Sequence, residues 1–203
     1  MRHGFVKAAV GTPAIRLADC EYNAERIFEM VQRAEAEGAK LLVLPELCIT
    51  GYGCKDLFLQ DSLLRAAEKA LISLVKRTAG MDVLLVAGVP LERRGKLYNA
   101  AACIQNGRIL GIAAKTKLPN YAEGAEVRYF AAPESEDTRI EIAGEMIPFG
   151  TGLLFCAKEL PGFKLGIEIC EELWVPDAPS VRLALAGATV IANPSAGAAF
   201  AGK

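Results

Sequence analysis

Hydrophobic and polar positions along the chain follow two recurrent patterns, which predict a succession of strands and helices. Short continuous apolar runs at 40–47 and 82–92 are typical of strands that are buried on both faces. An earlier apolar segment, at 5–13, also predicts a strand and closes on a Gly-Thr-Pro turn. Apolar residues recur at helical spacing at 19–39 and again after Asp61, which predicts two amphipathic helices.

Two pairs of apolar runs are joined by turn residues, and each pair predicts an antiparallel hairpin. The first pair flanks the Asn-Gly dipeptide at 106–107, which favours a tight two-residue turn. The second pair lies within 152–170, with the Pro-Gly dipeptide at 161–162 as its turn. A helix at 179–187 and a strand at 188–195 close the predicted series. Helices that cover a sheet with both crossovers and hairpins indicate a layered α/β domain with a mixed sheet.

Length and composition agree with this fold class and exclude several kinds of partner. The chain has 203 residues, of which 52% are hydrophobic, and this suits one domain with a sizeable core, or slightly more than one. Its 23 basic and 24 acidic residues give no electrostatic reason to expect nucleic acid or an anionic membrane as the main partner. Neither a membrane span of ~20 apolar residues nor a signal peptide is evident in the sequence, so we expect a cytoplasmic protein.

The cysteines predict reduced thiols and no metal site. They form no C-x-x-C pair, and the only histidine, His3, stands near none of them, which makes a zinc site improbable. At this length and without a secretion signal, most of them are expected to be core residues of a cytosolic protein. The six are Cys20, Cys48, Cys54, Cys103, Cys156 and Cys170.

Three predicted strands end in a reactive side chain: Glu46, Lys115 and Cys170. Each has an ordinary explanation by itself, because such a glutamate often caps a helix, such a lysine is often a surface charge, and such a cysteine is often core. Lys117, two residues further on, also competes with Lys115. In open α/β sheets, however, functional groups gather beyond the carboxyl ends of strands. The joint occurrence therefore predicts one site built from all three.

The chemistry of such a site follows from the problem of activating Cys170. The segment 167–174, IEICEELW, surrounds this cysteine with carboxylates, which disfavour a thiolate whose unperturbed pKa is already about 8.5. Glu46 could serve as general base if burial raised its pKa towards neutrality. Lys115 could favour the thiolate and then the oxyanion of a tetrahedral intermediate. A Cys–Glu–Lys set suits attack on an amide or nitrile carbon, with release of an amine or ammonia through a thioester.

At these residues the sequence resembles the nitrilase (carbon–nitrogen hydrolase) superfamily. The segments that carry the resemblance are LPELCITGY, KTKLPNY and EICEELWVP, followed by NPSAG. The fuller strings, such as ELCITGYGCKDLF, are similar to the N-terminal glutaminase domain of glutamine-dependent NAD synthetases. The resemblance runs from about Phe5 to Lys203. It implies an α/β fold of the nitrilase kind, a layered α-β-β-α sandwich with mixed sheets.

The resemblance also implies a role for each member of the set. Glu46 would be the general base, Lys115 would stabilise the tetrahedral intermediate, and Cys170 would attack the side-chain amide of glutamine. Other positions would line the pocket, orient the lysine and base, or contact the substrate: Tyr52, Tyr121, Glu126, Glu171, Trp174 and Ser195. The remaining carboxylates beside the cysteine, Glu168 and Glu172, would be structural or solvated.

Two local departures from the family pattern affect the expected substrate pocket. Gly124 and Ala125 stand where the branch usually carries Phe-Tyr, so we expect a mobile loop over 122–135. Gly197 stands where the family often has a serine, so a side-chain contact to the substrate is lost.

The family's sandwich continues beyond the NPSAG strand, so we expect residues 1–203 to form an incomplete, C-terminally truncated carbon–nitrogen hydrolase domain. No Walker-type phosphate loop occurs, and an ATP-dependent synthetase domain is therefore expected to be absent from this chain. ATP, Mg²⁺ and deamido-NAD would bind only in that domain, and this chain would need no cofactor. The full-length enzyme would use ammonia from glutamine to make NAD from deamido-NAD.

The resemblance further implies a homo-oligomer, because the family buries one face of its sandwich against a second subunit. Two alternatives to the glutaminase function remain. One is a stand-alone carbon–nitrogen hydrolase (amidase) that acts on another small amide. The other is an inactive fragment that only binds partner subunits.

Overall fold

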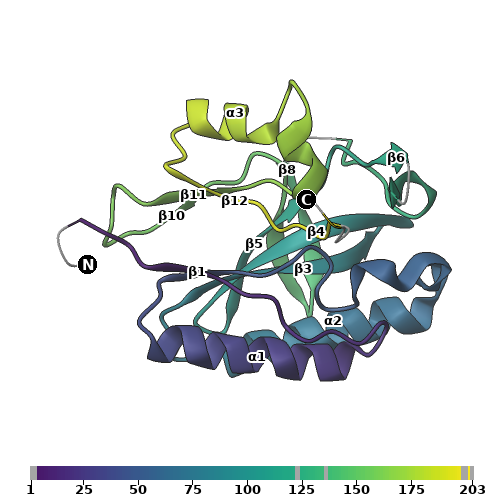
Figure 1. The fold of residues 1–203 in the computed structure, drawn as a ribbon, viewed down its shortest axis with the longest axis horizontal. Coiled ribbons are helices and arrows are strands. Elements are labelled where there is room, and N and C mark those ends of the chain that lie inside the picture. The colour runs from purple at the N-terminus through teal and green to yellow at the C-terminus, as the bar shows by residue number, and fades with distance from the viewer. Residues whose placement is uncertain (1–3, 122–123, 135–136, 198–200, 202–203) are drawn as a thin grey trace.

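Four layers of secondary structure make up the fold, in the order helix, sheet, sheet, helix (Figure 1). The computed structural model describes residues 4–121, 124–134, 137–197 and 201. Within these residues, two long helices cover one face of a seven-stranded sheet, and a three-stranded sheet on its other face carries a third helix. This is the α-β-β-α sandwich that the family resemblance implies.

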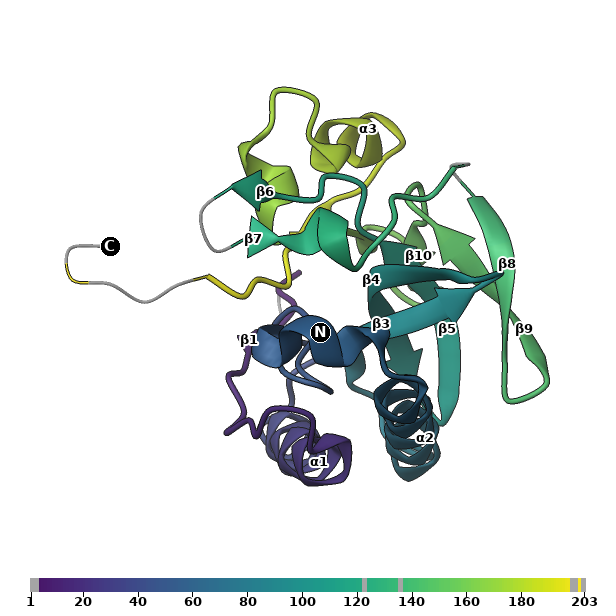
Figure 2. The same ribbon diagram turned by 90° about the vertical axis from the view of Figure 1, so that its right-hand side faces the viewer.

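The three α-helices fall where the sequence pattern predicts them. Helix α1 (Cys20–Ala36) begins after Asp19, whose side chain accepts a hydrogen bond from the Tyr22 amide at 3.1 Å and so caps the helix. Helix α2 (Asp61–Arg77) lies beside α1 under the larger sheet (Figure 2). Helix α3 (Pro179–Leu185) begins with a proline at its first position, which suits the unpaired amides of a helix start, and packs on the smaller sheet.

The larger sheet has the strand order β1-β2-β3-β4-β5-β9-β8 and is mixed, as predicted. Strands β1, β2 and β3 are parallel, β3, β4 and β5 are antiparallel, and β9 runs parallel to β5 and antiparallel to β8. Strands β1 and β2 are shorter than the apolar runs that predict them. The bounds are β1 (Ala8–Val10), β2 (Leu41–Val43), β3 (Leu84–Arg93), β4 (Lys96–Gln105), β5 (Arg108–Ala114), β8 (Asp137–Ile142) and β9 (Glu145–Gly150).

The smaller sheet places β11 (Lys164–Ile167) between two short strands. Strand β10 (Phe155–Cys156) pairs antiparallel with β11, which confirms the second predicted hairpin, although its loop is longer than a tight turn. Strand β12 (Val190–Ala192) pairs parallel with β11 and matches the predicted closing strand. A separate two-stranded ribbon is formed by β6 (Asn120–Tyr121) and β7 (Gly124–Ala125).

Turn chemistry explains which hairpins the sequence could predict. Asn106 and Gly107 take φ values of 48° and 74°, as a tight turn between β4 and β5 requires, and the predicted hairpin is confirmed. The hairpin of β8 and β9 was not predicted. Its turn residues, Ala143 and Gly144, take similar φ values of 51° and 81°, but alanine is not a residue that signals this conformation.

Strand β3 is buried on both faces, as its continuous apolar run predicts. Leu85 faces the helix layer and packs in the same core as Leu71 of α2. Val86 faces the other way and packs with Leu165 of β11, between the two sheets. Among the helices of the described residues, none combines the length and the apolar character that a bilayer crossing needs.

Candidate active site

The three predicted reactive residues all lie beyond the carboxyl ends of strands. Glu46 follows β2, Lys115 directly follows β5, and Cys170 follows β11. The first two belong to the larger sheet and the third to the smaller one. The two sheets face each other across a shared apolar core, so one end of the sandwich brings the three residues together.

Gly88 of β3 allows the turn that carries Glu46 to pass close to the sheet. A Cβ at position 88 would lie 2.2 Å from Leu47 N and 2.6 Å from Pro45 O, so any other residue would displace the turn. The turn is also fixed by a hydrogen bond from Ile49 N to Gly88 O at 3.2 Å. It leaves the Glu46 side chain buried, with 2% of its residue surface exposed.

Lys115 is fully buried between two carboxylates. Its Nζ lies 2.6 Å from Glu46 Oε1 and 2.7 Å from Glu126 Oε1. Glu126 opens the short helix η2 (Glu126–Arg128) and is itself buried. Asn99 Nδ2 donates to both carboxylates, at 2.7 Å to Glu46 Oε1 and 3.1 Å to Glu126 Oε2. We call these four residues, Glu46, Asn99, Lys115 and Glu126, the buried charge cluster.

Burial and neighbouring charges act in opposite directions within this cluster. Burial raises the pKa of Glu46 above its ordinary value, Lys115 opposes the rise, and Glu126 adds to it. Burial alone would lower the pKa of Lys115, but Glu46 and Glu126 outweigh it and the pKa is raised. Lys115 therefore stays an ammonium ion at neutral pH. The raised pKa makes Glu46 a stronger base than an exposed carboxylate, as a general base requires.

Cys170 begins the short helix η3 (Cys170–Trp174) in a strained conformation. Its φ is 51°, in the left-handed region that costs a residue with a side chain about 1–2 kcal/mol. Two hydrogen bonds hold its backbone there, one from Cys170 N to Pro194 O at 3.0 Å and one from the side-chain Nδ2 of Asn193 to Cys170 O at 3.3 Å. Backbone strain of this kind is concentrated at functional sites.

The Cys170 thiol is half-buried and interacts electrostatically with the buried charge cluster. Burial raises its pKa, and the negative charge of Glu46 raises it further. The Ala196 amide, the Lys115 ammonium and the Ser195 hydroxyl lower it. The raised pKa means that the thiol is protonated at neutral pH, so a nucleophilic Cys170 needs a base that removes its proton.

The other carboxylates beside Cys170 are buried, so the expectation that they could be solvated is wrong and the structural alternative holds. Glu168 accepts from Ser180 N at 3.0 Å. Glu172 accepts from Thr116 N at 2.7 Å through Oε1 and from Ile169 N at 2.6 Å through Oε2. Thr116 follows Lys115, and Ile169 precedes Cys170. Glu172 therefore links the backbone next to Cys170 to the backbone that follows β5.

The predicted substrate-binding residues fall into two groups. Tyr52, at the start of η1 (Tyr52–Leu59), donates its hydroxyl to Glu126 Oε1 at 2.9 Å and so joins the buried charge cluster. The exposed Ser195 donates to Asn193 Oδ1 at 2.5 Å and lies beside Cys170. The remaining members also lie towards solvent: the exposed Tyr121 hydrogen-bonds Glu171, which brings η3 beside the β6–β7 ribbon (Figure 2), and Trp174 is 76% exposed.

Of the three residues that depart from the family pattern, two form a short strand and the third is an exposed glycine. Gly124 and Ala125 form strand β7, paired with Tyr121 and Asn120. Residues 122–123 and 135–136 of the loop expected to be mobile lie outside the described residues, and the mobility stays a prediction. Gly197 is exposed and follows Ala196, whose amide N lies 3.3 Å from Glu46 Oε2.

The sequence patterns missed Asn99 and the Ala196 amide. Asn99 is a polar residue inside the apolar run of β4, and that irregularity was the available signal. The Ala196 amide carries no side-chain signal at all. In the part of the chain that the structure describes, no group of three or more His, Cys, Asp or Glu side chains could hold a metal ion.

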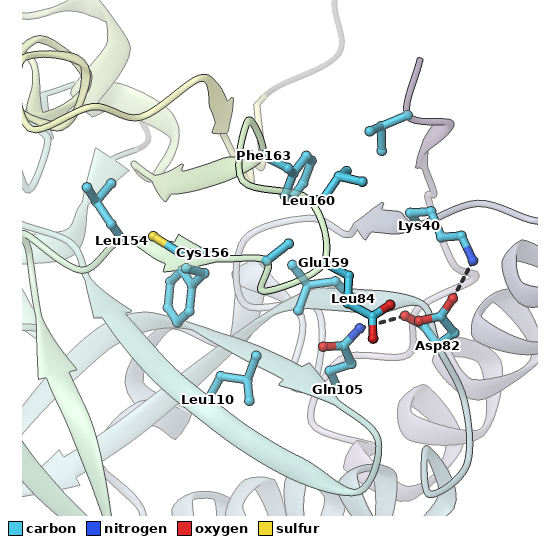
Figure 3. A pocket seen from close by; sticks show the side chains of 13 residues that line it. Lys40, Asp82, Leu84, Gln105, Leu110, Leu154, Cys156, Glu159, Leu160 and Phe163 are labelled. Carbon is cyan, nitrogen blue, oxygen red and sulfur yellow. Dashed lines mark hydrogen bonds and ion pairs between the residues drawn. The ribbon is translucent and has the colours of Figure 1, made fainter. Parts of the chain in front are cut away.

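A cavity of about 670 Å³ opens at the opposite end of the sandwich (Figure 3). Apolar side chains from both sheets line it, among them Leu84, Leu110 and Phe163. Its polar rim holds the ion pair between Lys40 and Asp82, which lie near the amino ends of β2 and β3. None of the candidate catalytic residues lines this cavity.

Comparison with known proteins places the chain in a family. The sequence profile of the carbon–nitrogen hydrolase family matches residues 7–202. Glutamine-dependent NAD(+) synthetase of Mycobacterium tuberculosis (strain ATCC 25618 / H37Rv) is 45% identical over 194 residues, which cover 96% of this chain and 29% of that protein. The Homo sapiens protein of the same name is 32% identical over 202 residues, with coverages of 93% and 28%. The chain thus spans less than a third of the length of these relatives.

Solved structures agree with the sequence relatives. A glutamine-dependent NAD(+) synthetase from Cytophaga hutchinsonii superposes with a TM-score of 0.79 at 32% identity and covers 95% of this chain and 31% of its own. An amidase from Nesterenkonia sp. superposes with a TM-score of 0.73 at 21% identity, with coverages of 99% and 68%. The amidase shares the fold, and both likenesses confirm the nitrilase-like sandwich.

Proposed function

The chain belongs to the carbon–nitrogen hydrolase family, and from that premise we propose that it hydrolyses the side-chain amide of glutamine. Cys170 is the nucleophile, Glu46 the general base and Lys115 the residue that stabilises the tetrahedral intermediate. The observation that carries this proposal is the buried charge cluster beside a strained, half-buried cysteine. Glutamine is the favoured amide because several relatives over this region are named glutamine-dependent NAD synthetases.

The reaction begins with proton transfer from the Cys170 thiol to Glu46. The sulfur attacks the amide carbon of glutamine, and the carbonyl oxygen takes up negative charge, which the Lys115 ammonium stabilises. Glu46 returns the proton to the nitrogen, the carbon–nitrogen bond breaks, and ammonia leaves behind a glutamyl thioester. Glu46 then takes a proton from water, whose oxygen attacks the thioester carbon. The carbon–sulfur bond then breaks, Glu46 returns its proton to the sulfur, and glutamate is released as the Cys170 thiol is restored.

The open side of the site supplies substrate contacts in this proposal. Tyr121, Glu171 and Trp174 lie towards solvent near Cys170, where the amino-acid end of glutamine would project. The carboxylate of Glu171 is complementary in charge to the α-ammonium group of glutamine. Tyr52 and Glu126 act inside the site, where they orient Lys115 and Glu46, and Ser195 lies beside the reacting sulfur.

In the full-length enzyme, the ammonia would serve an ATP-dependent synthetase domain that makes NAD from deamido-NAD. The relatives' greater length leaves room for such a domain, and ATP and Mg²⁺ would act there. We also propose that the domain forms a homo-oligomer. Several large apolar side chains are exposed on η3 and the adjoining α3: Leu173, Trp174, Val181 and Leu185.

Ammonia release from glutamine tests the proposal directly. The chain is incubated with glutamine and, separately, with acetamide, beside a Cys170→Ala variant. We expect ammonia from glutamine and none from the variant. Hydrolysis of acetamide without hydrolysis of glutamine would instead indicate a stand-alone amidase. A folded chain that releases no ammonia from either amide would indicate a fragment that only binds partner subunits.

A further inference from the structure

A fully buried asparagine, Asn99, contacts every charged member of the buried charge cluster. Its Nδ2 donates to Glu46 Oε1 at 2.7 Å and to Glu126 Oε2 at 3.1 Å. Its main-chain oxygen accepts from Lys115 N at 2.9 Å. One residue of β4 thus fixes the side chains of both carboxylates and the backbone of the lysine.

The unpaired oxygen of the Asn99 side chain, Oδ1, shows that the charges of Glu46 and Glu126 determine which way the amide is turned. Asn99 Oδ1 is buried and has no hydrogen-bond partner among the described residues. A flipped amide would turn this oxygen towards Glu46 and Glu126, where it would face two carboxylates. The observed orientation keeps both carboxylates satisfied and leaves the carbonyl unpaired. A buried acceptor without a partner lowers stability, so its presence calls for an explanation other than stability.

The two oxygens of Glu46 differ as a result. Oε1 accepts from both Lys115 Nζ and Asn99 Nδ2, at 2.6 Å and 2.7 Å. Oε2 receives only the longer hydrogen bond from Ala196 N, at 3.3 Å, among the described residues. Oε1 therefore has two strong donors, whereas Oε2 keeps a lone pair for another proton.

We infer that Asn99 is a positioning residue that fixes Glu46 so that Oε2 is the atom that accepts the Cys170 proton. This inference rests on the proposed function, because it assigns a role within that reaction. Asn99 is fully buried, and its described side-chain hydrogen bonds go to Glu46 and Glu126, so it acts through Glu46. It also stabilises the ionised form of Glu46, which is the form that can take a proton.

A change in pH dependence follows from this role. The groups that face Glu46 are Lys115 after β5, Glu126 of η2, Cys170 of η3 and Tyr52 of η1. Burial raises the pKa of Glu46, and the hydrogen bond from Asn99 is one of the interactions that lower it. Without that hydrogen bond, Glu46 would lose its proton only at a higher pH. Cys170 would then react more slowly on the acidic side of its pH profile.

The experiment measures the rate at which a chloroketone analogue of glutamine modifies Cys170, as a function of pH, in the chain and in two variants. Asn99→Leu removes the amide at similar volume, and Asn99→Ala removes it without added bulk if the first variant folds poorly. We expect the acidic limb to move to higher pH in both, with rates below it about tenfold lower and the alkaline plateau largely retained. Thr78→Val, which removes a buried hydroxyl at the end of α2 beside the turn between β4 and β5, should lower the melting temperature without moving the acidic limb.

Two outcomes would overturn the inference. The limb could stay in place in both Asn99 variants, or the rate could fall equally at every pH, as a merely structural role predicts. Failure of the proposed function would look different, because the unmodified chain would then show no preferential reaction at Cys170. If Cys170 is modified normally and the acidic limb does not move in the Asn99 variants, the role of Asn99 is rejected but the proposed function is not.

Discussion

Replacing Lys115 with methionine should destabilise the protein more than any exposed charge substitution. Lys115 Nζ is fully buried and lies 2.6 Å and 2.7 Å from Glu46 and Glu126, so its removal leaves two buried carboxylates without a counter-charge. Breaking a buried ion pair by removing one partner typically costs about 3–5 kcal/mol. A folded domain has only about 5–15 kcal/mol in total, so the midpoint of urea unfolding at pH 7 should fall steeply.

The pH dependence of this loss has a definite sign. Without the ammonium, burial and Glu126 raise the pKa of Glu46 still further above its ordinary value of 4.5. A carboxyl whose folded pKa is raised destabilises the protein above that pKa, and the penalty disappears as pH falls towards its unfolded value. The Lys115→Met variant should therefore recover much of its lost stability between pH 7 and pH 4.5.

Lys117→Met is the matched control. Lys117 lies two residues further on, is 37% exposed, and is 3.6 Å from the largely exposed Asp177. Its loss should cost less than about 1 kcal/mol, as exposed pairs do. Equal unfolding midpoints for the two variants at pH 7 would refute the reasoning. So would a loss in Lys115→Met that does not change between pH 7 and pH 4.5.

Three further predictions follow from the site. Glu46→Gln should keep the shape of the base but slow acylation of Cys170 by roughly 10²–10⁴-fold, and acylation at the normal rate in stopped-flow measurements would exclude Glu46 as the base. Glu172→Gln should place an amide NH₂ against hydrogen-bond donors, lower stability by about 1–3 kcal/mol and slow Cys170 labelling, whereas the exposed Glu145→Gln should do neither. Light scattering should show a homo-oligomer, and a strict monomer at every concentration would contradict the proposed association.

Local signals in the sequence predicted most of the fold. Amphipathic spacing located the helices, and the Asn-Gly dipeptide located one hairpin, because these patterns depend on residues close together in the chain. The hairpin of β8 and β9 was missed because Ala143 takes a left-handed conformation that alanine does not signal. Strand β2 ended earlier than its apolar run, since the chain turns at Pro45 to carry Glu46 over Gly88.

The site was predictable only in part, for a physical reason. The reactive side chains follow strands, so their approximate position could be inferred from sequence. The sequence could not show which neighbour of Cys170 turns inward. That depends on the short helix η3, which buries Glu172 and leaves Glu171 against Tyr121. Asn99 was missed because its role exists only once β4 lies beside the turn that carries Glu46.

Locating the cysteine that reacts first with a glutamine-like electrophile tests the central claim most directly. Exposure alone favours Cys156, because it is the exposed thiol, whereas Cys170 is half-buried and the other four cysteines are buried. The chain is treated with less than one equivalent of the chloroketone analogue of glutamine, and peptide mass spectrometry locates the adduct. An adduct on Cys170, suppressed by excess glutamine, is the predicted result. An adduct on Cys156 that glutamine does not suppress would contradict the assignment of Cys170 as the nucleophile.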